Sequence, residues 1–197
     1  MSRRIDENQA QFNYSRQLQR YIDKELPKYE VIQLGPTPEV MLLTGADQLP
    51  ITLDQAALAH AAEDRDGHNI DPKRLRFLPL NLRKPLAIFE SASMPDSQVI
   101  VTNIEQDGHK VMVAVHLNRK EGKLEINSIR SLYRRPVEQY VRWAEQGLLL
   151  YLDTKKAPGW APRLSRIQFP KIRSLLTEAD LKVSQETVEV KQMTEKV

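Results

Sequence analysis

Short runs of alternating apolar and polar residues fill the middle of the chain, and they predict a β-sheet. Five such runs fall at residues 86–91, 99–105, 110–117, 124–131 and 148–152. Asp107-Gly108 stands between two of them, and this dipeptide accepts the positive φ angles that a tight antiparallel hairpin requires. A second connection, the loop 119–122, ends in Gly122. Strands joined by such short turns pair with their neighbours in sequence, so we expect a mainly antiparallel meander.

Helical patterns lie mostly before this sheet. Four helices are predicted there: one within residues 1–28, one from Thr37-Pro38 to Gly45, one from Thr52 to about Asp64, and one from Asp71-Pro72 to Pro79. The third rests on the spacing of a capping box, in which Gln55 follows the Thr52 hydroxyl by three residues. A fifth helix runs from Pro136 to Gly147 and has its apolar residues on one face. The predicted fold is therefore α+β, with N-terminal helices packed on a mainly antiparallel β-meander.

The apolar positions also predict what is buried and where the domain ends. The strand Leu148–Leu152 is apolar at nearly every position, which indicates an inner strand covered on both sides. Trp143 and Tyr151 stand in apolar surroundings, and we predict that both are core residues. We divide the chain into an N-terminal helical arm (1–30), a main domain (31–157) and a tail (158–197). The tail begins basic, continues with mixed charge and is expected to be partly disordered.

Composition narrows the class of protein. The chain has 197 residues and 41% of them are hydrophobic, which suffices for one domain with tails. No apolar run approaches the ~20 residues of a membrane span, and no leader resembles a signal peptide. We therefore expect a soluble, cytoplasmic protein without a membrane partner. The absence of cysteine excludes disulfides, thiolate metal sites and a cysteine nucleophile.

Charge is informative through its distribution. The formal net charge is only +3, yet residues 154–177 contain six Lys or Arg and no Asp or Glu. Such a segment can follow a phosphate backbone, or it can be ordinary solvated surface, and the sequence leaves both readings open. The sequence lacks a His-Glu-x-x-His motif, a glycine-rich phosphate loop and a Gly-x-Ser-x-Gly elbow. We therefore expect no metal site and no cofactor.

The four histidines are the first candidates for chemistry, because their pKa lies near neutrality. His60 falls in a predicted helix, His68 in the loop after it, and His109 in the Asp-Gly turn. Histidines on loops are often simply solvated. His116 ends a strand in which Val111, Val113 and Val115 share the opposite face, so it is either half-buried in the core or projects into a cleft.

A second group of polar residues gathers at the end of one strand. It consists of Asn127, Ser128, Arg130, Ser131, Tyr133, Arg134 and Arg135. The guanidinium fork matches phosphate oxygens, and hydroxyl groups can hold a phosphate in register. The alternative is that these residues form the polar outer face of an edge strand.

Several short motifs, in this order, resemble the C-terminal domain of phage MuF-type head morphogenesis proteins, which is also found in phage polyvalent proteins and prophage toxins. The motifs are Leu34-Gly35-Pro36-Thr37-Pro38, His68, Leu78-Pro79, Lys84-Pro85-Leu86-Ala87-Ile88-Phe89 with Ser91, Val115-His116-Leu117, Ile126-Asn127-Ser128-Ile129-Arg130-Ser131-Leu132-Tyr133, Trp143 and Gly147-Leu148-Leu149-Leu150-Tyr151. The resemblance spans roughly Val31 to Lys156, and its specificity lies in the order of the motifs.

The resemblance implies a fold related to the barnase-EndoU-colicin-RelE (BECR) nucleases and a metal-independent endoribonuclease of a phage or mobile-element toxin type. The implied catalytic residues are His68, Arg130, Ser131 and Tyr133. The implied substrate contacts are His60, His116, Asn127, Arg134 and Arg135. RNA is then the expected partner, together with an immunity or antitoxin protein.

One departure from the family pattern concerns a lysine expected in the helix before His68. Leu58, Ala59 and His60 occupy that neighbourhood instead. Either His60 takes the place of the lysine or the cationic role is absent. The rival hypotheses are a binding module that holds nucleic acid or a protein without cutting, and a purely structural element of a phage protein.

Overall fold

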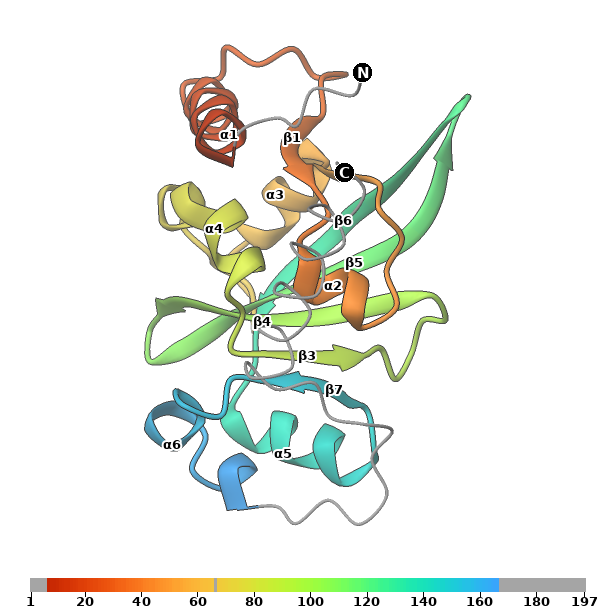
Figure 1. The fold of residues 1–197 in the computed structure, drawn as a ribbon. Coiled ribbons are helices and arrows are strands. Elements are labelled where there is room, and N and C mark those ends of the chain that lie inside the picture. The colour runs from red at the N-terminus through yellow and green to blue at the C-terminus, as the bar shows by residue number, and fades with distance from the viewer. Residues whose placement is uncertain (1–6, 66, 167–197) are drawn as a thin grey trace, which may run out of the picture.

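The structure is a computed structural model that describes residues 7–65 and 67–166. Its seven strands form one sheet in the order β1-β2-β6-β5-β4-β3-β7 (Figure 1). The strands are β1 (Ile32–Pro36), β2 (Pro50–Leu53), β3 (Ala87–Glu90), β4 (Ser97–Gln106), β5 (His109–Glu121), β6 (Leu124–Arg134) and β7 (Leu149–Leu152). Every neighbouring pair is antiparallel except β2 and β6. The predicted α+β class and the mainly antiparallel sheet are confirmed.

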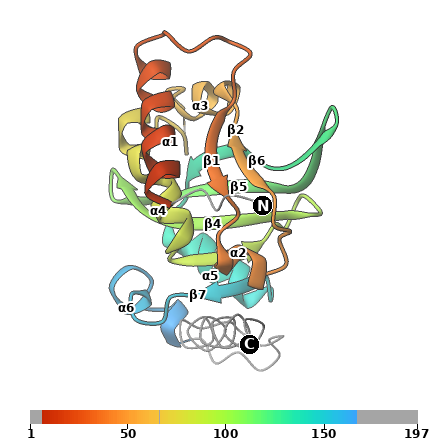
Figure 2. The same cartoon turned by 45° about the horizontal axis from the view of Figure 1, so that its top comes forward.

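Helices cover both faces of the sheet. They are α1 (Glu7–Ile22), α2 (Glu39–Leu43), α3 (Gln55–Ala61), the 3-10 helix η1 (Pro72–Phe77), α4 (Leu78–Arg83), α5 (Val137–Glu145), α6 (Ala157–Trp160) and the 3-10 helix η2 (Leu164–Arg166). The helices α1, α3 and α4 lie on one side, while α5 and α6 lie on the other (Figure 1, Figure 2). Residues of β5 alternate accordingly, with Val111 and Val113 in the first core cluster and Met112 in the second.

The Asp107-Gly108 turn has the predicted geometry. Asp107 has φ 52° and Gly108 has φ 74°, and β4 and β5 pair antiparallel on either side. The next hairpin is longer than predicted, because pairing continues to Glu121 and Leu124 and the connection is Gly122-Lys123. This hairpin protrudes from the body of the protein (Figure 1).

The capping-box prediction at Thr52 is wrong. Thr52 belongs to β2, and α3 begins after Asp54, which is the N-cap residue. Residues 51–53 pair in parallel with residues 127–129 of β6, far away in sequence. This non-local pairing outweighs the local capping signal.

The prediction that the strand at 148–152 is an inner strand is also wrong, because β7 pairs only with β3 and ends the described sheet. It is nevertheless covered on both faces: Leu149 and Leu152 pack in the cluster of α5, and Tyr151 packs in the cluster on the opposite side. The core prediction is therefore confirmed for Tyr151, whereas Trp143 is partly buried and packs against the α5 cluster.

The two ends of the described chain pack on the sheet. Tyr14 and Leu18 of α1 are buried in the first cluster, and Ala157, Ala161 and Leu164 are buried in the second. The rest of the predicted tail lies outside the described residues, and the domain boundaries stay predictions. No helix within residues 7–65 and 67–166 is long and apolar enough to cross a membrane.

Candidate active site

The loop after α3 is fastened to the end of β6. The strand β2 accompanies β6 only along residues 127–129. Further on, the Arg134 amide donates to the carbonyl oxygen of Gly67 over 2.7 Å. The Arg134 guanidinium donates to the carbonyl oxygen of His68 through Nε (3.0 Å) and Nη2 (2.5 Å), and to Asp107 Oδ2 over 2.6 Å. Arg134, predicted as a substrate contact, thus holds the His68 backbone against the sheet.

A glycine is required next to His68. Gly67 has φ +76°, and a Cβ atom there would stand 2.5 Å from Arg135 Nη1. The guanidinium of Arg135 also lies over the ring of Tyr133, 5.3 Å from its centroid. Arg135 therefore connects the His68 loop with the side chain of Tyr133.

The environment of His68 favours the neutral imidazole. Burial lowers the pKa of His68 most, and the neighbouring Arg65, His60 and Arg135 lower it further, while Glu63 acts in the opposite direction. Its Nδ1 atom is buried and has no hydrogen-bond partner. A histidine that is neutral near pH 7 can accept a proton, as a general base must.

His60 lies beside His68, with 4.6 Å between the ring centroids. Its Nδ1 is 3.1 Å from Glu63 Oε1, and its Nε2 contacts Arg65 Nη2, which also lies 2.9 Å from Nδ1. Because a guanidinium only donates, His60 accepts from Arg65 through a ring nitrogen that carries no proton, and its tautomer decides which nitrogen that is. Both ring nitrogens of His60 are therefore engaged within the protein.

Arg65 is the residue that sequence reasoning missed. It contacts His60 and helps to lower the pKa of His68, so a permanent positive charge stands beside the histidine pair. Arg65 also pairs with Glu63, with 3.2 Å between Nε and Oε2. The signal was the run of charged residues directly before His68, which composition alone assigns to a solvated loop.

Ser131 and Tyr133 point to the face of the sheet that carries α5. Ser131 stands opposite Ala114 and Tyr133 opposite Met112, whose side chain belongs to the α5 cluster. Burial raises the pKa of Tyr133, and the charge of Arg135 opposes this only in part. The Tyr133 phenol therefore keeps its proton throughout the neutral range. Arg135 is therefore the residue common to the two groups: it stands next to Gly67 and lowers the pKa of His68, and it lies over the Tyr133 ring. Ser131 lies two residues before Tyr133 on the same face.

A comparison with known families gives one match. The family model described as the phage MuF C-terminal domain matches residues 59–159, just over half of the chain. The chain belongs to the phage MuF C-terminal domain family. Searches of curated proteins and of solved structures found no match. In this MuF C-terminal domain the matched segment contains all nine candidate residues and Arg65, whereas the motif at residues 34–38 lies before it.

Three of the candidate residues lie apart from His68 in their contacts. Arg130 Nη1 pairs with Asp54 Oδ2 over 2.9 Å. The pKa of His116 is lowered first by burial and then by Arg130 and Arg119, so Arg130 and His116 form a second polar group. The Asn127 amide donates to Thr37 Oγ1 (2.8 Å), and its oxygen accepts from the Asn118 backbone (3.0 Å). Asn127 therefore joins β5 to the segment directly after β1. Arg135 rather than Arg130 supplies the cation beside His68.

Within the described residues, no three or more His, Asp or Glu side chains form a group that could hold a metal ion.

Proposed function

We propose that this MuF C-terminal domain is an endoribonuclease of the BECR type that cleaves RNA by transesterification and needs no metal ion. The observation that carries the proposal is a histidine with a lowered pKa, held by Arg134 against the strand end where Arg135 and Tyr133 lie. Cleavage by this route needs a base, an acid and cations that balance the charge on phosphorus. This strand end supplies all three from neighbouring positions.

In the proposed reaction, His68 takes the proton from the ribose 2′-hydroxyl, and the 2′-oxygen forms a bond to phosphorus. The bond from phosphorus to the 5′-oxygen breaks, and the Tyr133 phenol gives its proton to that oxygen. The products are a 2′,3′-cyclic phosphate and a 5′-hydroxyl. Solvent then gives a proton back to Tyr133 and takes the proton from His68. The proposed acid is Tyr133 rather than His60, whose ring nitrogens contact Glu63 and Arg65.

The cations have separate tasks in this proposal. Arg135, over the Tyr133 ring, binds the non-bridging phosphate oxygens, whose negative charge grows in the transition state. Arg65 adds to the effect of burial in lowering the pKa of His68, and it takes the place of the lysine expected from the family pattern. The Ser131 hydroxyl, on the same face as Tyr133, orients the phosphate.

An intracellular ribonuclease of this kind belongs to the toxins of phages and mobile elements. We therefore propose cytoplasmic RNA as the substrate and an immunity or antitoxin protein as the natural partner. The open end of β6 around His68 is the surface that such a partner would have to block.

The pH dependence of cleavage tests the proposed base. Because the pKa of His68 is lowered from 6.5, the midpoint of the decline of kcat/KM at acid pH in EDTA should lie below pH 6.5. The measurement is a pH series with a short RNA that carries a fluorophore and a quencher. A decline centred above 6.5 would contradict a site that destabilises the charged imidazolium form of His68.

A further inference from the structure

A cavity of about 230 Å³ opens beside the proposed active site. It lies between the β4–β5 hairpin and the helices α5 and α6, and Arg135 is one of its lining residues. The same guanidinium stands next to Gly67 and over the Tyr133 ring. The cavity and the His68 site therefore share a phosphate-binding side chain, although nothing in the proposed reaction uses the cavity.

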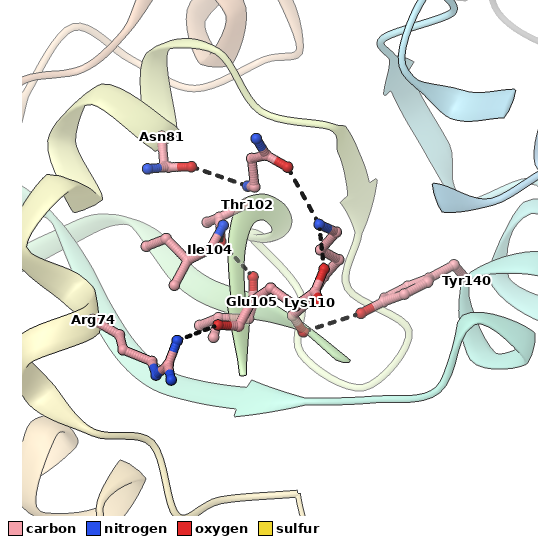
Figure 3. A network of polar contacts seen from close by, with 9 residues as sticks. Arg74, Asn81, Thr102, Ile104, Glu105, Lys110 and Tyr140 are labelled. Atoms are coloured by element: carbon pink, nitrogen blue, oxygen red, sulfur yellow. Dashed lines mark hydrogen bonds and ion pairs between the residues drawn. The ribbon is translucent and has the colours of Figure 1, made fainter. Parts of the chain in front are cut away.

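The hairpin wall of this cavity is held in place by polar contacts (Figure 3). Lys110 Nζ lies 2.8 Å from Glu105 Oε2 and 3.3 Å from Asn103 Oδ1. The hydrogen bond from Lys110 to the Glu105 carboxylate is the main reason why the pKa of Glu105 is lowered. The Tyr140 hydroxyl of α5 donates between the carbonyl oxygens of Lys110 (3.4 Å) and Arg135 (3.3 Å).

Two further contacts fix the hairpin to the other side of the sheet. Arg74 Nη1 donates to the carbonyl oxygen of Glu105 over 3.2 Å, and Asn81 Oδ1 accepts from the Asn103 amide over 3.0 Å (Figure 3). The wall is therefore pre-formed and does not need to be ordered when a ligand binds.

The lining has the chemistry of a nucleotide site. Trp160 packs edge-on against Tyr140, with 5.5 Å between ring centroids, and lines the cavity. Its indole Nε1 is buried and has no acceptor in the structure. The lining contains one carboxylate, that of Glu105, and three basic side chains, those of Arg135, Lys110 and His109. An aromatic platform next to donors for phosphate is how proteins hold an unpaired nucleotide.

We propose that this cavity binds the nucleotide adjacent to the scissile phosphate, with its base against Trp160 and its phosphate on Arg135. The Glu105–Lys110 pair then offers one acceptor and one donor to the edge of the base. The inference rests on the proposed function only in placing this nucleotide next to the bond that is cleaved. Occupancy of the cavity by an unpaired nucleotide stands on the lining itself.

Binding of an uncleavable RNA tests the cavity separately from catalysis. The probe is a pool of short single-stranded 2′-O-methyl RNAs of random sequence, which lack the attacking hydroxyl. The chain has two tryptophans, so its ¹⁵N spectrum has two indole signals, and a Trp143→Phe variant assigns them. The pool should shift the Trp160 signal and leave that of Trp143 in place.

Affinity should fall about 5- to 150-fold in Trp160→Leu, which is the usual effect of removing one stacking partner. His109→Ala should also weaken binding. Because His109 is exposed and makes no side-chain hydrogen bond or ion pair with the residues that the structure describes, this variant decides if Trp160→Leu fails to fold. Lys123→Ala, which removes a cation at the tip of the β5–β6 hairpin, is the matched control and should bind like the wild type.

An unmoved Trp160 signal at saturating probe, or wild-type affinity in both cavity variants, would overturn the inference. The two proposals fail in different ways. Binding through Trp160 without any cleavage of natural RNA would remove the ribonuclease and keep the cavity. Cleavage of RNA together with unchanged probe binding in the cavity variants would keep the ribonuclease and remove the cavity as a nucleotide site.

Discussion

Replacing His68 by alanine should lower the rate of RNA cleavage by about 10²–10⁴-fold, which is the usual contribution of one positioned general base. The substitution removes the imidazole and leaves the backbone carbonyl that Arg134 binds, so the loop keeps its anchor. The measurement compares initial rates on a defined RNA in EDTA. Lys123→Ala, far from the site at the hairpin tip, should cleave at the wild-type rate.

Added imidazole sharpens this test. If His68 acts as the base, free imidazole should restore part of the activity of His68→Ala and leave the wild type and Lys123→Ala unchanged. A variant that had lost activity by misfolding would not respond. Full activity of His68→Ala without imidazole would remove His68 from the mechanism.

Leu149→Asp should unfold the protein. Leu149 is 2% exposed in β7 and packs in the cluster of α5, so an aspartate there would be an unpaired buried charge. Such a charge costs several kcal/mol, against a total stability of roughly 5–15 kcal/mol. Loss of the cooperative transition in circular dichroism, or a large drop in Tm, is the expected result.

Two controls accompany this variant. Leu124→Asp makes the same chemical change at a position that is 69% exposed on the protruding hairpin, and it should leave Tm nearly unchanged. Glu195→Ala, which lies outside the described residues, should also have no measurable effect. Equal melting temperatures for Leu149→Asp and the two controls would refute the burial argument.

Local signals allowed most of the sheet to be predicted. The Asp107-Gly108 turn fixes a hairpin through backbone geometry that few residues tolerate, and the apolar spacing after Pro136 predicts α5 with its buried face. Both signals depend only on residues close in sequence. The alternation of valines in β5 also predicted that Val111, Val113 and Val115 share one face, and they pack in the first core cluster.

Strand pairing between distant parts of the chain could not be predicted from such local signals. Residues 51–53 form a strand because β6 is available beside them, and no residue near Thr52 indicates this partner. β7 is apolar like an inner strand although it ends the described sheet, because helices and aromatic residues cover both its faces. In both cases the neighbours come from distant parts of the chain.

The candidate site shows the same division. The family resemblance singled out His68 and the polar end of β6, and the structure brings His68 next to Arg135 and His60. The resemblance did not indicate that Arg134 serves as an anchor, that Arg130 pairs with Asp54, or that Arg65 stands beside the histidines. Which arginine meets which loop depends on the bulge in β6 after Ile129 and on the course of the loop from α3.

The chemical ends of the products distinguish cleavage by transesterification from binding without cleavage. Natural RNA is incubated with the purified chain in EDTA, and the new ends are identified by phosphatase and kinase labelling. The account predicts 2′,3′-cyclic phosphate and 5′-hydroxyl ends from the wild type and almost none from His68→Ala. RNA that stays intact while it binds with an affinity that falls as salt rises would contradict it and indicate a binding module instead.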